Sequence, residues 1–257
     1  MILQSTNQPF LSVRSISNTY TSRPLGIIGK KEKKPVLNNI SFEIERGEIF
    51  GLVGESGCGK TTLAKCILGL IDYDGDIFIN GRKREAKPSF AERRGSAFDV
   101  QAVFQNSSSS LNPVKTTGWI LEEPLRAHRL GSAIERQKRV DEILDLVGLD
   151  SSYKKRQPAE LSSGQKQRVA IGFALMLKPG LIVADEPVSA LDVSVAAQVL
   201  NLFRDLNERL GLALLFISHN LEMVRYLCDR VAVMRNGGIT ECIAGSLPAP
   251  LKESCFW

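Results

Sequence analysis

The segment Gly54-Glu55-Ser56-Gly57-Cys58-Gly59-Lys60-Thr61 constrains the fold of this chain more than any other. It matches the pattern G-x-x-x-x-G-K-[ST] and stands between an apolar run at 48–53 and a stretch at 61–71 with helical spacing of its apolar residues. Strand, glycine loop and helix in this order predict a phosphate-binding loop. The alternative, an ordinary glycine turn, does not explain the flanking elements.

The chemistry of such a loop follows from its backbone. Glycines let successive N–H groups wrap a phosphate, and the start of the helix adds partial positive charge. Lys60 can then reach the β- and γ-phosphates, and the Thr61 hydroxyl can ligate Mg²⁺. The loop residues expected to contact a nucleotide are Gly54, Glu55, Ser56, Gly57, Cys58, Gly59, Lys60, Thr61 and Thr62.

A second signal is the apolar run at 181–184 followed by Asp185 and Glu186. Strand-like runs at 181–184 and 212–217 are separated by helical patterns, which predicts a parallel sheet covered on both faces. Ligands bind at the carboxyl end of such strands. We therefore expect Asp185 in a Mg²⁺ shell and Glu186 as the base that polarises the attacking water. A strand edge that merely ends in two acids is the alternative.

A third signal is Leu161-Ser162-Ser163-Gly164-Gln165, which opens an apolar helix shortly before the acidic pair. Ser162 is a candidate N-cap, and the helix start is a candidate anion-binding end. A plain helix start is the alternative.

The remaining patterns predict a β-rich beginning and a helical middle. Strands are expected at 10–20 and 36–45, and a hairpin at 74–82 with turn signals at 74–75 and 80–81. Helical spacing of Val140, Ile143, Leu144 and Val147, with Gly148 as a stop, indicates an inserted helical subdomain.

Composition excludes several classes of protein. The longest apolar stretch is interrupted well short of the ~20 residues of a membrane helix, and no signal-peptide layout occurs. We expect the chain to be soluble by itself, with any membrane role acting through a partner. Five irregularly spaced cysteines and two histidines argue against a disulfide framework or a histidine-built metal site. The net charge of +5 selects no partner.

The order of motifs resembles that of the nucleotide-binding subunits of ABC transporters, from about residue 10 to 241. After the phosphate loop come Gln105 in Val103-Phe104-Gln105, the segment 161–165, Asp185-Glu186-Pro187, Ser189-Ala190-Leu191-Asp192, and His219 in Ile217-Ser218-His219-Asn220. The resemblance implies an α/β P-loop NTPase with a RecA-like parallel sheet core, an antiparallel β subdomain and an inserted helical signature subdomain. The implied single ABC ATPase domain (1–257) comprises a core at 10–105 and 166–241, a helical subdomain at 106–165 and a short tail at 242–257.

The resemblance also assigns roles at the matching positions. Tyr20 would stack on adenine, although a core aromatic at a strand end is the alternative. Gln105 would sense Mg²⁺ and link the site to a membrane partner, and Asp192 would lie at a dimer interface. His219 would hold the γ-phosphate and act in catalysis with Lys60, Gln105 and Glu186, although such a histidine is often merely packed or solvated. The residues implied to contact ATP held by an opposite subunit are Ser162, Gly164 and Gln165.

Narrower resemblance points to the importers of peptides and nickel, on the segments 53–60, 105–113 and 187–194. It implies ATP and Mg²⁺ as cofactors. The implied partners are a second, non-identical ATPase subunit, two transmembrane permease subunits and, indirectly, an extracytoplasmic binding protein, with the chain at the cytoplasmic face of the inner membrane. The segment Val36-Leu37-Asn38-Asn39 and the short tail after Glu241 resemble the second ATPase subunit of nickel importers slightly more than the peptide members.

Two other classes remain open. A soluble ABC-type ATPase acting on nucleic acid or the ribosome usually has two cassettes or long coiled-coil insertions, and this chain shows neither, so no nucleic acid partner is expected. A small-molecule kinase or a GTPase would leave the segment 161–165 unexplained, and no Asn-Lys-x-Asp guanine signal occurs.

Two positions depart from the family pattern. Ser163 stands where glycine is usual, which adds a side chain where backbone approaches phosphate and weakens this half-site. Phe173 stands where arginine is common. Together they fit a subunit that pairs with a non-identical partner.

Overall fold

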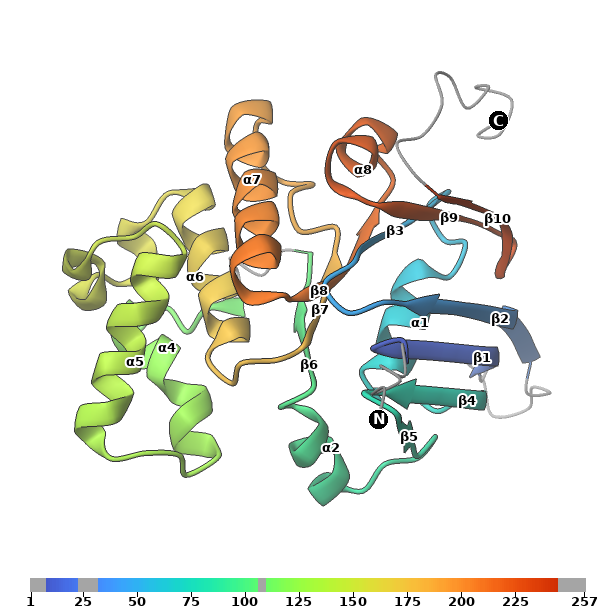
Figure 1. Cartoon of the computed structure of the whole chain (residues 1–257), viewed down its shortest axis with the longest axis horizontal. Coiled ribbons are helices and arrows are strands. Elements are labelled where there is room, and N and C mark those ends of the chain that lie inside the picture. Colours follow the sequence, from blue (N-terminus) through green and yellow to red (C-terminus); the bar gives the residue numbers. More distant parts are fainter. Residues whose placement is uncertain (1–7, 23–31, 106–109, 245–257) are drawn as a thin grey trace, which may run out of the picture.

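The computed structural model describes residues 8–22, 32–105 and 110–244, which form two β-sheets and surrounding helices (Figure 1). The strands of the antiparallel sheet, in spatial order, are β2 (Glu32–Ile44), β1 (Leu11–Ser22), β4 (Asp74–Ile79) and β5 (Arg82–Arg84). The strands of the larger sheet are β10 (Gly238–Ala244), β9 (Arg230–Arg235), β3 (Ile49–Gly54), β8 (Ala213–Ser218), β7 (Leu181–Asp185) and β6 (Val100–Val103). Its pairs are parallel except β10 with β9.

The central strands of the larger sheet are largely apolar because both of their faces are covered, and polar side chains stand only at the carboxyl ends of β7 and β8. Every residue of β3, β7 and β8 is buried. Successive side chains alternate between two cores: Leu215 and Ile217 of β8 join one, and Leu214 and Phe216 join the other. The predicted parallel sheet covered on both faces is confirmed.

One core lies between the larger sheet, the antiparallel sheet and α1 (Lys60–Ile67). The other packs α7 (Val193–Leu210), α8 (Leu221–Leu227) and a group of helices against the opposite face. That group holds α4 (Thr117–Ala127), α5 (Ala133–Leu146), the 3₁₀ turns Ser151–Lys155 and Pro158–Glu160, and α6 (Ser163–Leu175). None of the helices in the described ranges is long and apolar enough to cross a bilayer.

The helical group contains the predicted pattern. Val140, Ile143 and Leu144 are the buried residues of α5, and Gly148 follows it with φ of +68°. Residues 165 and 166 both lie in α6, which packs against α4 and α5. A Cβ on Gly172 would lie 2.9 Å from the Ile143 side chain and 3.2 Å from that of Leu121.

Two local predictions were wrong. The helix after the phosphate loop ends at Ile67 rather than 71, because Gly69 adopts a φ of +66° and reverses the chain. Asp74 and Gly75 lie in β4 instead of a turn, and only Asn80-Gly81, both with positive φ, connects β4 to β5. Residues 242–244 of the predicted tail belong to β10, and 106–109 and 245–257 lie outside the described residues.

Candidate functional site

The glycine loop joins the carboxyl end of β3 to the start of α1, as predicted. Gly59 precedes the helix with φ of +110°, no side chain of the described residues caps this end, and no acid stands in the first turn. The free N–H groups and the helix dipole therefore favour an anion. Gly54 allows β3 to approach β9 closely, since a Cβ there would lie 2.2 Å from the Met234 carbonyl oxygen.

Lys60 lies folded against this loop. Its Nζ donates to the carbonyl oxygens of Gly54 (2.7 Å) and Glu55 (2.8 Å), and the residue is only 6% exposed. The ammonium thus stands inside the curve of the loop, where it adds a full positive charge to the partial charges of the N–H groups.

Asp185 ends β7 and is 4% exposed. Burial raises the pKa of its carboxyl, and a hydrogen bond from the Thr61 side chain opposes that shift. Its Oδ1 is buried and has no hydrogen-bond partner among the described residues. An orphaned carboxylate oxygen beside a threonine hydroxyl is a donor set that suits Mg²⁺, which uses one or two carboxylates together with phosphate oxygens.

Glu186 follows in a strained conformation, with φ of +49°. Its N–H donates to the Ile217 carbonyl at the end of β8 (2.9 Å), which fixes the backbone. Its carboxylate lies 3.0 Å from Nδ1 of His219, and the two side chains are 20% and 59% exposed. The carboxylate of Glu186, the candidate base, is thus partly shielded from solvent, and the His219 side chain that contacts it is the more exposed of the two.

Ser189 connects Gln105 to the backbone of Glu186. Gln105 Nε2 donates to Ser189 Oγ (3.3 Å), and Ser189 donates through Oγ (3.1 Å) and N–H (3.3 Å) to the Glu186 carbonyl oxygen. The family resemblance described above includes Ser189 in the segment 189–192 but assigns a role there only to Asp192. Only the fold, which brings residue 105 next to 189, reveals this contact.

A cleft of about 400 Å³ collects the predicted residues from distant parts of the chain. Lys60, Thr61, Gln105, Glu186 and His219 line it, together with Val36, Ser56, Gly57, Gly59 and Thr62. An adjoining hollow of about 580 Å³ shares three of these residues and is lined by Tyr20, which is 44% exposed. The phosphate cleft and the hollow lined by the exposed Tyr20 ring therefore meet at Val36, Ser56 and Gly57.

The predicted signature residues do not line this cleft. Ser162 caps α6, accepting from the Gln165 N–H, while the Gln165 side chain accepts from the Ser162 N–H and donates to the Tyr153 hydroxyl (2.8 Å). Gly164 is buried where a Cβ would lie 2.5 Å from the Val195 side chain. Ser163 is exposed at the first helical position.

Two further positions have local roles. Asp192 caps α7 through a hydrogen bond from the Val195 N–H (3.0 Å). Phe173 is half-buried and lines a separate hollow with Gln105 and Glu123. Nothing in the structure explains why phenylalanine replaces arginine there.

Strand β3, the phosphate loop and α1, with the acidic pair at the carboxyl end of the parallel strand β7 two positions along the sheet, define a P-loop nucleotide-binding protein. Residues 37–189 match the family described as ABC transporter. The chain belongs to the ABC transporter family, and it is an ATP-binding ATPase of that family's cassette type.

The similar curated proteins cover nearly the whole chain. A Brucella ovis protein provisionally named as a peptide import ATP-binding protein is 46% identical over 92% of this chain and 72% of its own length. The dipeptide transport ATP-binding protein DppF of Haemophilus influenzae is 42% identical (96% and 77%). The oligopeptide transport ATP-binding protein AppF of Bacillus subtilis is 40% identical (92% and 72%).

Solved structures confirm the fold. The ATP-binding cassette MJ0796, in a dimeric post-hydrolysis state bound to ADP and Pi, matches with a TM-score of 0.78 and 28% identity over 91% of this chain and 98% of that chain. A second dimeric structure of MJ0796, described as a bacterial ABC transporter cassette, gives 0.78 and 29% over the same shares.

Proposed function

We propose that this chain is the ATP-hydrolysing subunit of a membrane importer of peptides. The observation that carries the proposal is the single cleft in which Lys60, Thr61, Gln105, Glu186 and His219 meet. The names of the three relatives all concern peptides. The slight preference for nickel as the cargo depends on two short segments of the sequence, and the names of these relatives give it no support.

In the proposed mechanism, the loop N–H groups and Lys60 hold the phosphates of ATP. The remaining contacts of the loop come from Gly54, Glu55, Ser56, Gly57, Cys58, Gly59, Thr61 and Thr62. The hollow lined by Tyr20 receives the adenine, where an exposed ring offers a stacking surface. Lys60 can keep one carbonyl contact and turn its remaining protons to phosphate, because an ammonium has three donors.

The residues that would hold Mg²⁺ are Thr61 and Asp185, with Gln105 at the edge of the shell. The buried, unpartnered Oδ1 of Asp185 supports this assignment. When bound, the ion would neutralise charge on the phosphates and polarise the γ-phosphoryl group.

Glu186 is the proposed general base, which takes a proton from the attacking water at its carboxylate. The contact with Nδ1 of His219 orients that carboxylate. It also turns Nε2 away from Glu186, so that an imidazolium could donate from Nε2 to the γ-phosphate while it holds the base. The strained backbone of Glu186 is the kind of outlier that concentrates at functional sites.

A second ATPase subunit would complete the site. Ser162, Gly164 and Gln165 lie at the start of α6, outside their own cleft, and in the proposal they face ATP held by the partner, with Asp192 at the interface. Ser163 and Phe173 support a non-identical partner. Two permease subunits would anchor the pair at the cytoplasmic face of the inner membrane, and an extracytoplasmic binding protein would deliver the peptide. Residues 106–165 would carry the signature within one domain spanning 1–257, and the core would comprise 10–105 and 166–241.

Uptake of a labelled dipeptide and of labelled nickel tests the proposal, in cells that carry the native chain or Glu186→Gln. We expect Glu186→Gln to abolish dipeptide uptake and leave nickel uptake unchanged. Loss of nickel uptake alone would reverse the choice of cargo. Unchanged uptake of both would contradict the proposal of a peptide importer.

A further inference from the structure

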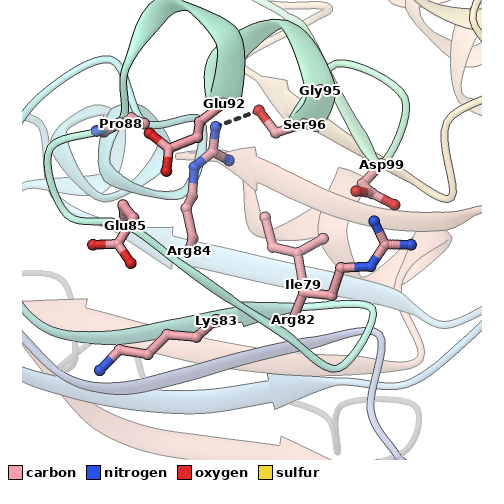
Figure 2. Close-up of a pocket in the computed structure, with 10 residues that line it drawn as sticks. All are labelled: Ile79, Arg82, Lys83, Arg84, Glu85, Pro88, Glu92, Gly95, Ser96 and Asp99. Atoms are coloured by element: carbon pink, nitrogen blue, oxygen red, sulfur yellow. Dashed lines mark hydrogen bonds between the residues drawn. The ribbon is translucent and has the colours of Figure 1, made fainter.

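The helix that carries the phosphate loop has its other end held by a buried arginine from the antiparallel sheet. Arg84, on the short edge strand β5, is 8% exposed. Its Nη1 donates to the Ile67 carbonyl oxygen (2.6 Å), and its Nη2 donates to that of Leu68 (2.8 Å) and to Ser96 Oγ (2.7 Å). Figure 2 shows the side chain extending from β5 towards Ser96 of α2 (Phe90–Ser96).

The last carbonyl groups of α1 need hydrogen-bond donors from outside the helix, and Arg84 supplies two of them. Gly69 N–H bonds to the Cys66 carbonyl (2.9 Å), and Leu70 N–H bonds to that of Lys65 (2.8 Å). This pair of bonds is the Schellman motif, which satisfies two of the terminal carbonyls. The next two, on Ile67 and Leu68, are those that Arg84 takes. The guanidinium therefore completes the C-terminal cap of α1.

The positively charged guanidinium of Arg84 contacts carbonyl oxygens at the C-terminal end of α1 instead of a carboxylate. Within the described ranges, no carboxylate oxygen lies within ion-pairing distance of its nitrogens. Burial lowers the pKa of this guanidinium. The carbonyl oxygens at the C-terminal end of α1 place partial negative charge against it, and Tyr73 and Asp99 also oppose the lowering of its pKa. Gly69 leaves room for this contact, since a Cβ there would lie 2.7 Å from Arg84 Nε.

The length of α1 links its two ends. The helix has eight residues, so it is about 12 Å long and moves as one body. Its first residue is Lys60, and its first N–H groups face the phosphate cleft. A shift at Ile67 and Leu68 would therefore move Lys60 and the N–H groups relative to the rest of the loop, which is fixed to β3.

We propose that Arg84 is a positioning residue for ATP. It fixes the position of α1, the phosphate-binding helix, by holding the C-terminal end of that helix. The inference rests on the proposed nucleotide site. Within the described ranges, no hydrogen bond or ion pair joins the Arg84 side chain to a residue that lines the cleft, so its effect on ATP passes through α1. Ser96 holds the guanidinium in place from α2 and accepts its second Nη2 hydrogen bond.

The test compares Arg84→Lys with Arg82→Lys. Both residues are on β5 and line the same hollow of about 330 Å³, but Arg82 is exposed and its side chain has no hydrogen bond or ion pair to another described residue. A lysine at 84 keeps the charge but lacks the planar fork of the guanidinium, so a single ammonium replaces the two nitrogens that bind the Ile67 and Leu68 carbonyls and Ser96. The purified proteins are titrated with a fluorescent ATP analogue, well below the apparent Tm of each variant, and ATPase kinetics are measured in the assembled complex.

We expect Arg84→Lys to raise the Kd for the analogue and the KM for ATP by about fivefold or more, with kcat within about twofold of native, because a displaced helix weakens ground-state and transition-state contacts alike. Arg82→Lys should leave both constants within about twofold of native. A lower Tm with unchanged Kd and KM would overturn the proposal and leave Arg84 a purely structural residue.

Two further variants keep the outcome decisive. If Arg84→Lys does not fold, Ser96→Ala removes the anchor of the guanidinium together with one exposed hydrogen bond to the Arg93 carbonyl. This variant is expected to raise the Kd by about two- to threefold, and an unchanged Kd would overturn the proposal. Lys60→Ala serves as the reference for the site itself. If Lys60→Ala binds the analogue as native does, the proposed nucleotide site is wrong, whatever Arg84 does.

Discussion

Asp185→Asn should stabilise the nucleotide-free protein while it disables the ATPase. Asp185 is 4% exposed, its Oδ1 has no partner among the described residues, and burial raises its pKa. Asparagine has the same shape and can still accept the Thr61 hydrogen bond, but it carries no charge that must leave water. We expect a gain of about 1 kcal/mol, which raises the Tm by roughly 2–4 °C for a chain of this size.

The pH dependence of this gain follows from the direction of the pKa shift. Because the folded-state pKa is raised, the native carboxylate costs stability above that pKa, and the cost disappears as pH falls through it towards the ordinary value of 3.8. The Tm difference between Asp185→Asn and native protein should therefore be largest near neutral pH and shrink in acid.

Function should change in the opposite direction. Without a carboxylate to share with Mg²⁺, we expect hydrolysis by the assembled complex to fall by about 100-fold or more. The matched control is the exposed Asp145, whose carboxylate has no hydrogen bond or ion pair to another described residue: Asp145→Asn should alter neither Tm nor hydrolysis. A Tm lowered by Asp185→Asn would refute the desolvation argument, and native hydrolysis would refute the metal assignment.

Two further predictions concern other sites. A thiol reagent should block ATPase activity through the half-buried Cys58, whose Sγ lies 3.8 Å from Lys60 Nζ, and bound ATP should protect it; equal inhibition of Cys58→Ser would contradict this. Glu48→Gln should lower the free energy of unfolding by about 2–3 kcal/mol in urea denaturation, because Glu48 is 9% exposed and accepts from Arg230 and the Glu45 N–H. The exposed Glu208→Gln should change it by less than about 0.5 kcal/mol, and an equal change in both would count against the argument.

The sequence predicted those parts of the site that depend on contiguous residues. The phosphate loop needs only the order of strand, glycines, lysine and helix, and Asp185 and Glu186 need only an apolar strand before them. Ser162 was identified as an N-cap from its own segment, and its capping contacts with Gln165 are local as well.

Contacts between distant segments could not be predicted in the same way. The link from Gln105 through Ser189 to Glu186 joins positions more than 80 residues apart. Glu186 combines a strained φ with a hydrogen bond from its N–H to the end of β8, and no pattern in its own segment indicates either feature. Arg84 looks like a surface residue on a short basic strand, and only its burial against the end of α1 shows otherwise.

The boundaries that differed have local physical causes. Leu70 continues the apolar spacing of α1, so the pattern extends to residue 71, but a glycine with positive φ ends the helix first. Asp74-Gly75 has the composition of a turn, yet these residues are absorbed into β4, where Asp74 pairs with Ser17 of β1. Tertiary pairing decides such cases, and composition alone does not express it.

Single-turnover hydrolysis by Glu186→Gln in the assembled transporter tests the central claim most directly. Glu186 contacts His219 through its side chain and is held by its backbone, so glutamine should preserve the fold and the affinity for ATP. The account predicts that the variant retains ATP in a closed pair of subunits and hydrolyses it at least ~100-fold more slowly than native protein, which is the contribution expected of a general base. Hydrolysis at the native rate would contradict the assignment of Glu186 and the mechanism built on it.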